Sequence, residues 1–191
     1  MRSDPIHVKR SVLATSLAAG ILFFSSVSFG APQWTPFVSK EGRFSVLMIG
    51  APRSSQSNIA TPVGTVNEYL YSTECGAIML DAEYANLPSL AALFGGRSRI
   101  YRDVVEEFLQ REQGTELGFA KFVKDAYHGR VLTYEAKGRF GKLWMLLISR
   151  RLYILNASVP KDYADKSVID VYLNSFQPIY HDTDASRAGK G

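Results

Sequence analysis

Alternating apolar and polar residues run along much of this chain, and this pattern predicts β-strands. In residues 77–84, Ile78 and Leu80 would face one side of a sheet, and Asp81 and Glu83 the other. The same reasoning predicts further strands at residues 34–38, 43–49, 59–63, 65–71, 115–124, 130–136, 142–149 and 152–158. Residues 50–58 are polar and predict a loop.

Two segments have a helical period instead. In residues 99–112, Ile100, Val104 and Phe108 form one apolar stripe and charged residues fill the opposite side. A second amphipathic helix is predicted at residues 163–176, and a short helical turn at residues 87–94. The order of elements is therefore strands, helix, strands, helix.

Residues 143–148 are apolar at every position, so this strand must be covered on both faces. Its connections to neighbouring strands are short, which requires antiparallel pairing. The predicted fold class is α+β: an antiparallel β-sheet flanked by helices on both faces, that is, an α-β-α sandwich.

The first thirty residues have the pattern of a signal peptide. Basic residues precede an apolar run over residues 12–24, and small residues at Ser28 and Gly30 favour cleavage after Gly30. The alternative is an uncleaved membrane anchor. The expected organisation is a signal peptide at 1–30, a single domain at 31–178 and a disordered polar tail at 179–191. The expected location is periplasmic or secreted.

Charge narrows the choice of partners. The 191 residues contain 22 basic and 18 acidic side chains, and removing residues 1–30 would leave these charges nearly balanced. A balanced surface gives no reason to expect nucleic acid as a partner. No membrane span is expected after the signal peptide is cleaved.

Candidate catalytic and metal-binding residues are few. Beyond residue 30 the chain keeps two histidines, His128 and His181, and one cysteine, Cys75. This set predicts no metal site and no cofactor, and the acids Asp182 and Asp184 lack the pattern of a calcium loop. A Ser-His-Asp hydrolase that uses His128 is an alternative, because the members of a triad need not be adjacent in sequence. Asp125 precedes His128 by three residues, but in a strand-to-turn segment this spacing does not direct one toward the other. Cys75 is interpreted as a small half-buried turn residue, with a reactive thiol or an intermolecular disulfide as alternatives.

Two further features allow a binding role. Residues 95–98 precede the first long helix and are either a flexible joint or an anion site. Aromatic residues on the predicted elements are either core residues or the lining of a groove for an apolar ligand or a peptide. These aromatic residues are Tyr69, Tyr71, Tyr84, Tyr101 and Trp144.

Several segments resemble a group of exported bacterial proteins. The resemblance covers most of residues 34–178 and depends on residues 37–52, 104–109, 127–130, 151–155 and 172–176. More remotely, the element order is similar to the PsbP-like and Mog-like fold, whose members act as extrinsic subunits or binding adaptors. The resemblance implies a non-catalytic role and carries over no functional residue.

The sequence therefore predicts an exported non-enzymatic binding or accessory protein of the cell envelope, with an envelope protein as the expected partner. The first alternative is a carrier of a small apolar ligand in an aromatic-lined cavity, and the second is a hydrolase. No catalytic or metal-binding residue is assigned, and the binding residues are left unspecified.

Overall fold

The computed structural model describes residues 32–61, 64–88 and 96–179. All of them belong to one unit of the chain, Pro32–Gly191. Strands make up most of this part, which also contains two helices, α2 (Gly96–Glu112) and α3 (Ser167–Asn174). Neither of these described helices is long and apolar enough to cross a membrane.

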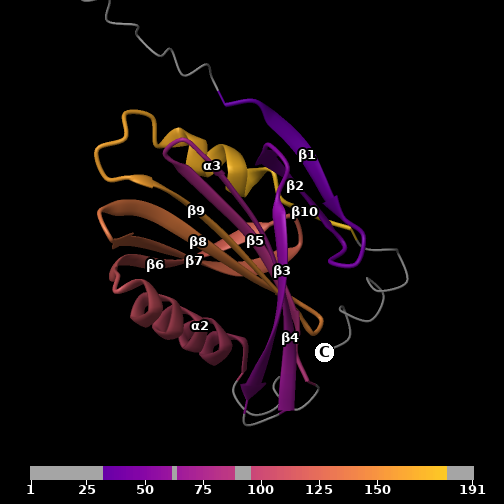
Figure 1. The fold of residues 1–191 in the computed structure, drawn as a ribbon. Helices are drawn as coiled ribbons and strands as arrows, with labels where there is room; N and C mark the ends of the chain where they lie inside the picture. Colours follow the sequence, from indigo (N-terminus) through magenta and orange to yellow (C-terminus); the bar gives the residue numbers. More distant parts are fainter. Residues whose placement is uncertain (1–31, 62–63, 89–95, 180–191) are drawn as a thin grey trace, which may run out of the picture. The chain divides into compact units, whose positions relative to one another are not determined.

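Seven strands form the main sheet, and every neighbouring pair is antiparallel. Their order across the sheet is β3-β4-β5-β9-β8-β7-β6, so β9 lies at the centre (Figure 1). The strands are β3 (Arg53–Thr61), β4 (Gly64–Cys75), β5 (Ile78–Asn86), β6 (Thr115–Lys124), β7 (Tyr127–Ala136), β8 (Arg139–Ile148) and β9 (Arg151–Pro160).

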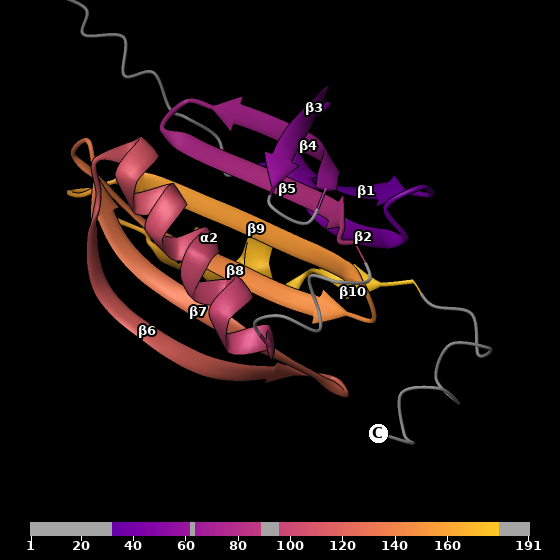
Figure 2. The same cartoon turned by 90° about the horizontal axis from the view of Figure 1, so that it is seen from below.

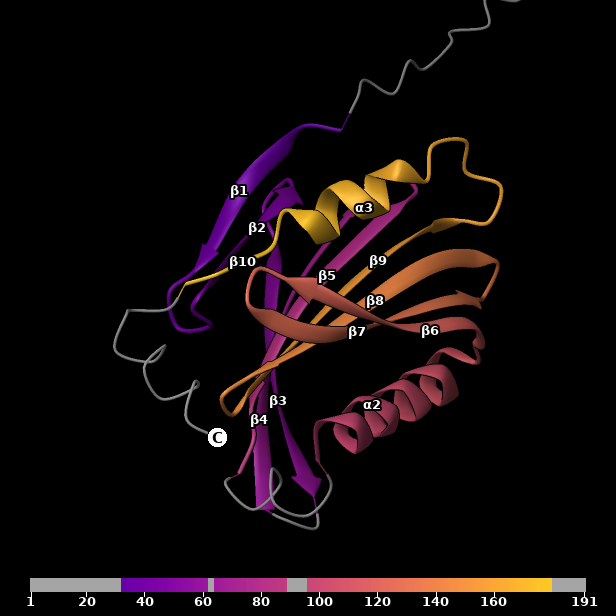
Figure 3. The same ribbon diagram turned by 180° about the vertical axis from the view of Figure 1, so that it is seen from behind.

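A second, smaller sheet has three strands in the order β1-β2-β10. These are β1 (Trp34–Ser39), β2 (Phe44–Ile49) and the two-residue strand β10 (Gln177–Pro178). The chain therefore returns, after α3, to pair beside a strand formed near its start. The three strands lie on the same side of the main sheet as α3 (Figure 3).

The main sheet separates two apolar clusters. On one face, α2 packs through Val105 and Phe108 against strands β7, β8 and β9. On the other face, β2 and α3 pack against β5, β8 and β9. Met145 and Leu147 of β8 belong to the first cluster, and Leu146 of the same strand to the second. Coverage on both faces, predicted from the apolar run, is confirmed.

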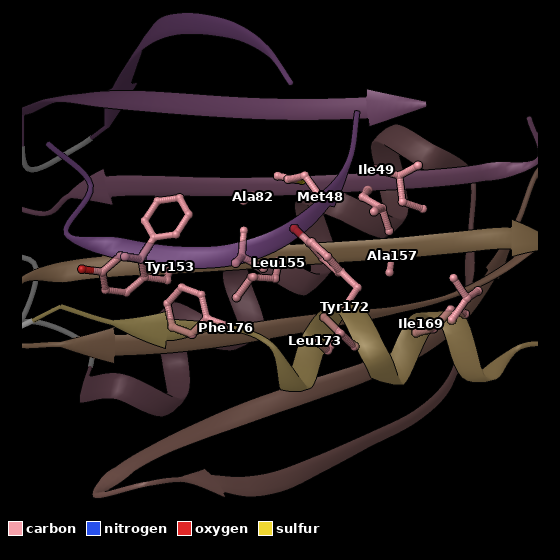
Figure 4. Packing of buried hydrophobic residues seen from close by; sticks show 14 of the residues in the cluster. Met48, Ile49, Ala82, Tyr153, Leu155, Ala157, Ile169, Tyr172, Leu173 and Phe176 are labelled. Carbon is pink, nitrogen blue, oxygen red and sulfur yellow. The ribbon is translucent and has the colours of Figure 1, made fainter. Parts of the chain in front are cut away.

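Phe44 of β2 lies at the centre of the larger cluster and is fully buried. Its ring contacts those of Tyr153, at 5.9 Å between centroids, and Phe176, at 5.7 Å. Figure 4 shows Tyr153 and Phe176 beside each other, with Tyr172 of α3 directed toward the main sheet. The Tyr172 hydroxyl donates a hydrogen bond to the Asp81 carbonyl oxygen at 2.6 Å, which joins α3 to β5.

The predicted α-β-α sandwich is wrong, because the protein is mostly β and has two sheets. Strands β1 and β2, expected in the central sheet, form a layer of their own with β10. The helix expected at 163–176 is only the eight residues of α3, about 12 Å long. A seven-stranded sheet is about 30 Å wide, so a helix of this length covers only part of it.

Other expectations have mixed outcomes. The helix expected at 99–112 is confirmed as α2, although it begins three residues earlier, at Gly96. The loop expected at 50–58 is wrong, because β3 begins at Arg53. The predicted signal peptide, the polar tail after Ile179 and most of the turn expected at 87–94 lie outside the described residues.

Replacing Phe44 with Ala should destabilise the protein by about 3–5 kcal/mol, because it leaves a cavity beneath five neighbouring rings. Urea denaturation measures this change in the free energy of unfolding. Val38→Ala on β1 is the control, since Val38 is 52% exposed and should change stability little. Equal effects of the two substitutions would contradict the position of Phe44 in the core.

Candidate functional site

The structure places His128 and Asp125, the residues considered for the alternative hydrolase, on the surface. His128 is exposed on β7, and Asp125 is an exposed residue of the preceding turn, with φ of 53°. Cys75 is a free, exposed cysteine at the end of β4, rather than half-buried. His181, Asp182 and Asp184 lie outside the described residues. Within the described ranges, no group of three or more His, Cys, Asp or Glu side chains is placed to hold a metal ion.

The five aromatic residues considered as a groove lining are packing residues. Tyr69 and Tyr84 stack on each other at 4.7 Å, Tyr71 packs against Phe37, and Trp144 stacks on Phe122. The buried Tyr101 hydroxyl accepts a hydrogen bond from the Leu147 amide at 2.8 Å. None of the five lines the cavity described next.

A cavity of about 490 Å³ lies between α2 and the main sheet. Helix α2 packs over β7, β8 and β9, while β3, β4 and β5 extend beyond it (Figure 2). The cavity occupies the place where this cover ends, with walls from β4, β5, β9 and one side of α2, together with Ile59 of β3 and Leu143 of β8. It therefore extends from the centre of the sheet toward the edge strand β3.

Aliphatic side chains form most of the walls. The sheet contributes Val66, Leu70, Ala85, Leu143, Leu152 and Ile154, and the helix contributes Ile100, Val104 and Phe108. Three carboxyl groups of the sheet, from Glu68, Asp81 and Glu83, also line the cavity. The site thus combines a large apolar surface with a small set of acidic groups.

Glu83 and Glu68 are a hydrogen-bonded carboxyl pair. Burial raises the pKa of Glu83 well above its ordinary value, and the hydrogen bond and negative charge of Glu68 raise it further. The pKa of Glu68 is lowered, first by its hydrogen bond with Glu83. The Ser57 hydroxyl also donates to Glu68 at 2.7 Å. These opposite shifts favour ionised Glu68 and protonated Glu83 within the pair.

Asp81 belongs to a second chain of hydrogen bonds on the same face. The Tyr134 hydroxyl donates to the Asn156 Oδ1 at 2.6 Å, and the Asn156 Nδ2 donates to Asp81 at 3.0 Å. Burial raises the pKa of Asp81, and the bond from Asn156 partly offsets this. Burial also raises the pKa of Tyr134 to about 12, so its hydroxyl stays protonated as the donor.

Helix α2 adds both signs of charge to the opposite wall. It contributes Asp103, Glu107 and Glu112 together with one cation, Arg111. The Arg111 guanidinium lies 3.3 Å from Glu112 and 5.7 Å from the centre of the Phe108 ring. The arrangement is suited to hold an apolar body, to accept hydrogen bonds and to exchange one proton.

Sequence reasoning did not identify this site, although its signals are visible. Asp81 and Glu83 alternate with buried residues in β5, and they were assigned simply to the opposite face from Ile78 and Leu80. Asn156 interrupts the apolar run of β9. A polar residue inside a central strand is such a signal, but only the strand order shows that β5 and β9 are neighbours.

Comparisons with known proteins identify the fold. No family model matches the chain, and no curated protein matches its sequence. The solution structure of cyanobacterial PsbP (CyanoP) from Synechocystis sp. PCC 6803 is similar, with a TM-score of 0.53 and 17% sequence identity. The match covers 83% of this chain and 99% of that one. The predicted remote similarity to the PsbP-like fold is confirmed, and at this identity the likeness shows the fold alone.

A crystal structure of a protein from Bacteroides thetaiotaomicron VPI-5482 also matches, with a TM-score of 0.42 and 9% identity. That match covers 78% of this chain and 49% of the other. At this TM-score it supports no argument.

Glu83→Gln should stabilise the protein at about pH 8 by on the order of 1 kcal/mol, since each unit of raised pKa costs about 1.4 kcal/mol once the group ionises. In the unfolded chain Glu83 ionises near its ordinary pKa, while the folded chain keeps the proton longer. Stability contributed by Glu83 is therefore lost as the pH rises from about 4.5 through the raised pKa.

The measurement is urea denaturation of wild type and variant at about pH 4 and pH 8. Wild type and Glu83→Gln should be equally stable at the lower pH. At the higher pH the variant should be the more stable protein, because its glutamine keeps an N–H donor for Glu68. Glu106→Gln, on the exposed side of α2, is the matched control. A Glu83 variant that is less stable than wild type at pH 8 would show that its carboxylate is not disfavoured.

Proposed function

We propose that this protein is an exported, non-enzymatic binding protein of the cell envelope that holds a small molecule in the cavity between α2 and the main sheet. The observation that carries this proposal is the cavity itself. Its volume of about 490 Å³ lies within the range of natural ligand sites, which are mostly apolar with a few convergent polar groups. The walls described above have this composition.

The chemistry of the walls favours holding a molecule over converting it. The lining contributed by the described residues includes carboxyl groups, one amide and one guanidinium, but no hydroxyl, thiol, imidazole or amine side chain. Apart from the carboxyl groups themselves, these described residues supply no side-chain nucleophile. The PsbP-like fold is in keeping with an accessory role, although fold alone does not determine function.

A docking role for a large protein partner has less support. The large hydrophobic side chains that are exposed in the described residues are aliphatic, and they belong to several elements. They are Val38, Leu117, Val123, Val171 and Ile179. No exposed aromatic patch among the described residues marks a protein interface, so the cavity is the better-supported binding site.

Export is the part of the proposal supported by the N-terminal pattern. The protein purified from the envelope of its own cells should have the mass of residues 31–191, because cleavage is expected after Gly30. Intact-mass spectrometry under denaturing conditions measures this directly. The full-length mass in a membrane fraction would instead show an uncleaved anchor, and recovery from the cytoplasm would contradict export.

The cavity should bind N-phenyl-1-naphthylamine, a neutral apolar dye, and Val104→Trp should weaken this binding by about tenfold or more. Val104 is half-buried on α2 and lines the cavity, so a tryptophan there would occupy its space. Dye fluorescence titration measures the affinity, and circular dichroism checks that the variant is folded.

Val171→Trp is the matched control, because Val171 is a helical valine on α3, 43% exposed and outside the cavity. This variant should bind the dye as wild type does. A wild-type protein that leaves the dye unbound, or a dye affinity unchanged by Val104→Trp, would contradict the proposed function.

A further inference from the structure

We propose that the natural ligand of the cavity is an organic cation, with an aliphatic body and a single ammonium group that lies against Glu68 and Glu83. This inference rests on the proposed binding function and names the chemical class of the ligand. It follows from where the carboxyl groups lie in the sheet and from which charges face them.

Glu83 occupies an apolar row of the main sheet. Its direct neighbours across the strands are Leu70 on β4 and Ile154 on β9, and Met145 of β8 follows Ile154 in the same row. Glu68 lies opposite Ala85, which is two residues after Glu83 in β5 and therefore belongs to the same face of the sheet. The two carboxyl groups therefore form an acidic spot bordered by aliphatic side chains, with Asp81 and Asn156 farther along the same face.

No protein cation forms an ion pair with this spot. Among the ion pairs of the described residues, none includes Glu68, Asp81 or Glu83. Arg111, the single cation in the walls, lies against Glu112 instead. The charge of Arg111 lowers the pKa of Glu68, Asp81 and Glu83, but it is a lesser cause for each of them. Burial remains the largest cause that raises the pKa of Glu83, so its carboxylate is costly to form, and a ligand ammonium group in direct contact would reduce that cost.

Other ligand classes fit the walls less well. An anionic ligand would meet six carboxyl side chains and one guanidinium, so it would be repelled. A metal ion alone has no cluster of three ligating side chains in the described part of the chain, and it would leave the aliphatic walls unfilled. A neutral apolar molecule would fill the walls but further desolvate the acidic pair.

Binding of the cation displaces a proton. Where Glu83 still carries the proton of the pair, the ammonium group favours the carboxylate form, and that proton passes to the solvent. No covalent bond other than that O–H bond changes. Because burial and Glu68 raise the pKa of Glu83, this displacement becomes easier as the pH rises, and the affinity for the cation should rise with it.

The other charged and polar groups around the pair do not reverse this rise of cation affinity with pH. Asp81 on β5 also ionises more readily at higher pH, and Asn156 and Ser57 do not titrate. Asp103, Glu107 and Glu112 of α2 line the opposite wall and add negative charge there, and Arg111 is the one cation of these walls. Each change with rising pH makes the site more attractive to a cation.

The test compares three ligands that share one ten-carbon chain: decyltrimethylammonium, 1-decanol and decyl sulfate. Each is titrated into the mature protein by calorimetry below its micelle concentration. Decyltrimethylammonium has a permanent charge, so any pH dependence reports groups of the protein. It should bind about tenfold or more tightly than decanol at pH 8, less tightly at pH 5.5, and with release of about one proton. Decyl sulfate should bind most weakly.

The variant Glu68→Gln/Glu83→Gln should lose about tenfold or more of its affinity for decyltrimethylammonium and bind decanol at least as tightly as wild type does. Glu106→Gln, an exposed acid of α2 outside the cavity, should change neither value. Because only a folded protein retains the cavity, decanol binding also shows that the variant is intact.

The outcomes separate the two proposals. If decanol and decyltrimethylammonium bind equally, or if the double variant keeps its preference for the cation, the inference is overturned while the binding function stands. If none of the three ligands binds and the dye does not bind either, the proposed function fails with it.

Discussion

The central strands β8 and β9 are apolar on both faces, and the rest of the structure depends on covering them. Leu146 and Leu147, adjacent in β8, belong to different clusters on opposite sides of the sheet. One cover is α2, and the other combines α3 with the small sheet. Burying an aliphatic side chain of this size contributes about 1.5–3 kcal/mol, so neither layer is optional. Because the chain returns after α3 to form β10 beside β2, α3 and the small sheet are joined into one layer that covers this face.

The cavity is a consequence of the same constraint. Helix α2 lies over β7, β8 and β9, where the apolar side chains are most dense, and the described helices leave β4 and β5 uncovered on that face. Strand β5 is therefore buried on one side, through Leu80 and Tyr84, and lines a partly open site on the other, through Asp81 and Glu83. Burial in this position raises the pKa of both Asp81 and Glu83, so the protein's own contacts disfavour their ionised forms.

The likeness to cyanobacterial PsbP defines the framework, and the side chains of the cavity define what this chain can bind. At 17% identity the likeness shows the arrangement of strands and helices alone. On this framework, the cavity face of the chain has the carboxyl pair of Glu68 and Glu83 and the bonded series of Tyr134, Asn156 and Asp81.

The sequence by itself determined most of the strands, helix α2 and the need to cover β8 on both faces, because these follow from local periodicity. It also showed that Asp81 and Glu83 face away from Ile78 and Leu80. Only the tertiary structure decided that β1 and β2 leave the main sheet, that α3 is too short to cover a face, and that Glu68 meets Glu83 beside the flank of α2. Strand order and the position where a covering helix ends depend on contacts between segments far apart in the chain. The alternation of apolar and polar residues along one strand contains no information about which distant segment will lie beside that strand.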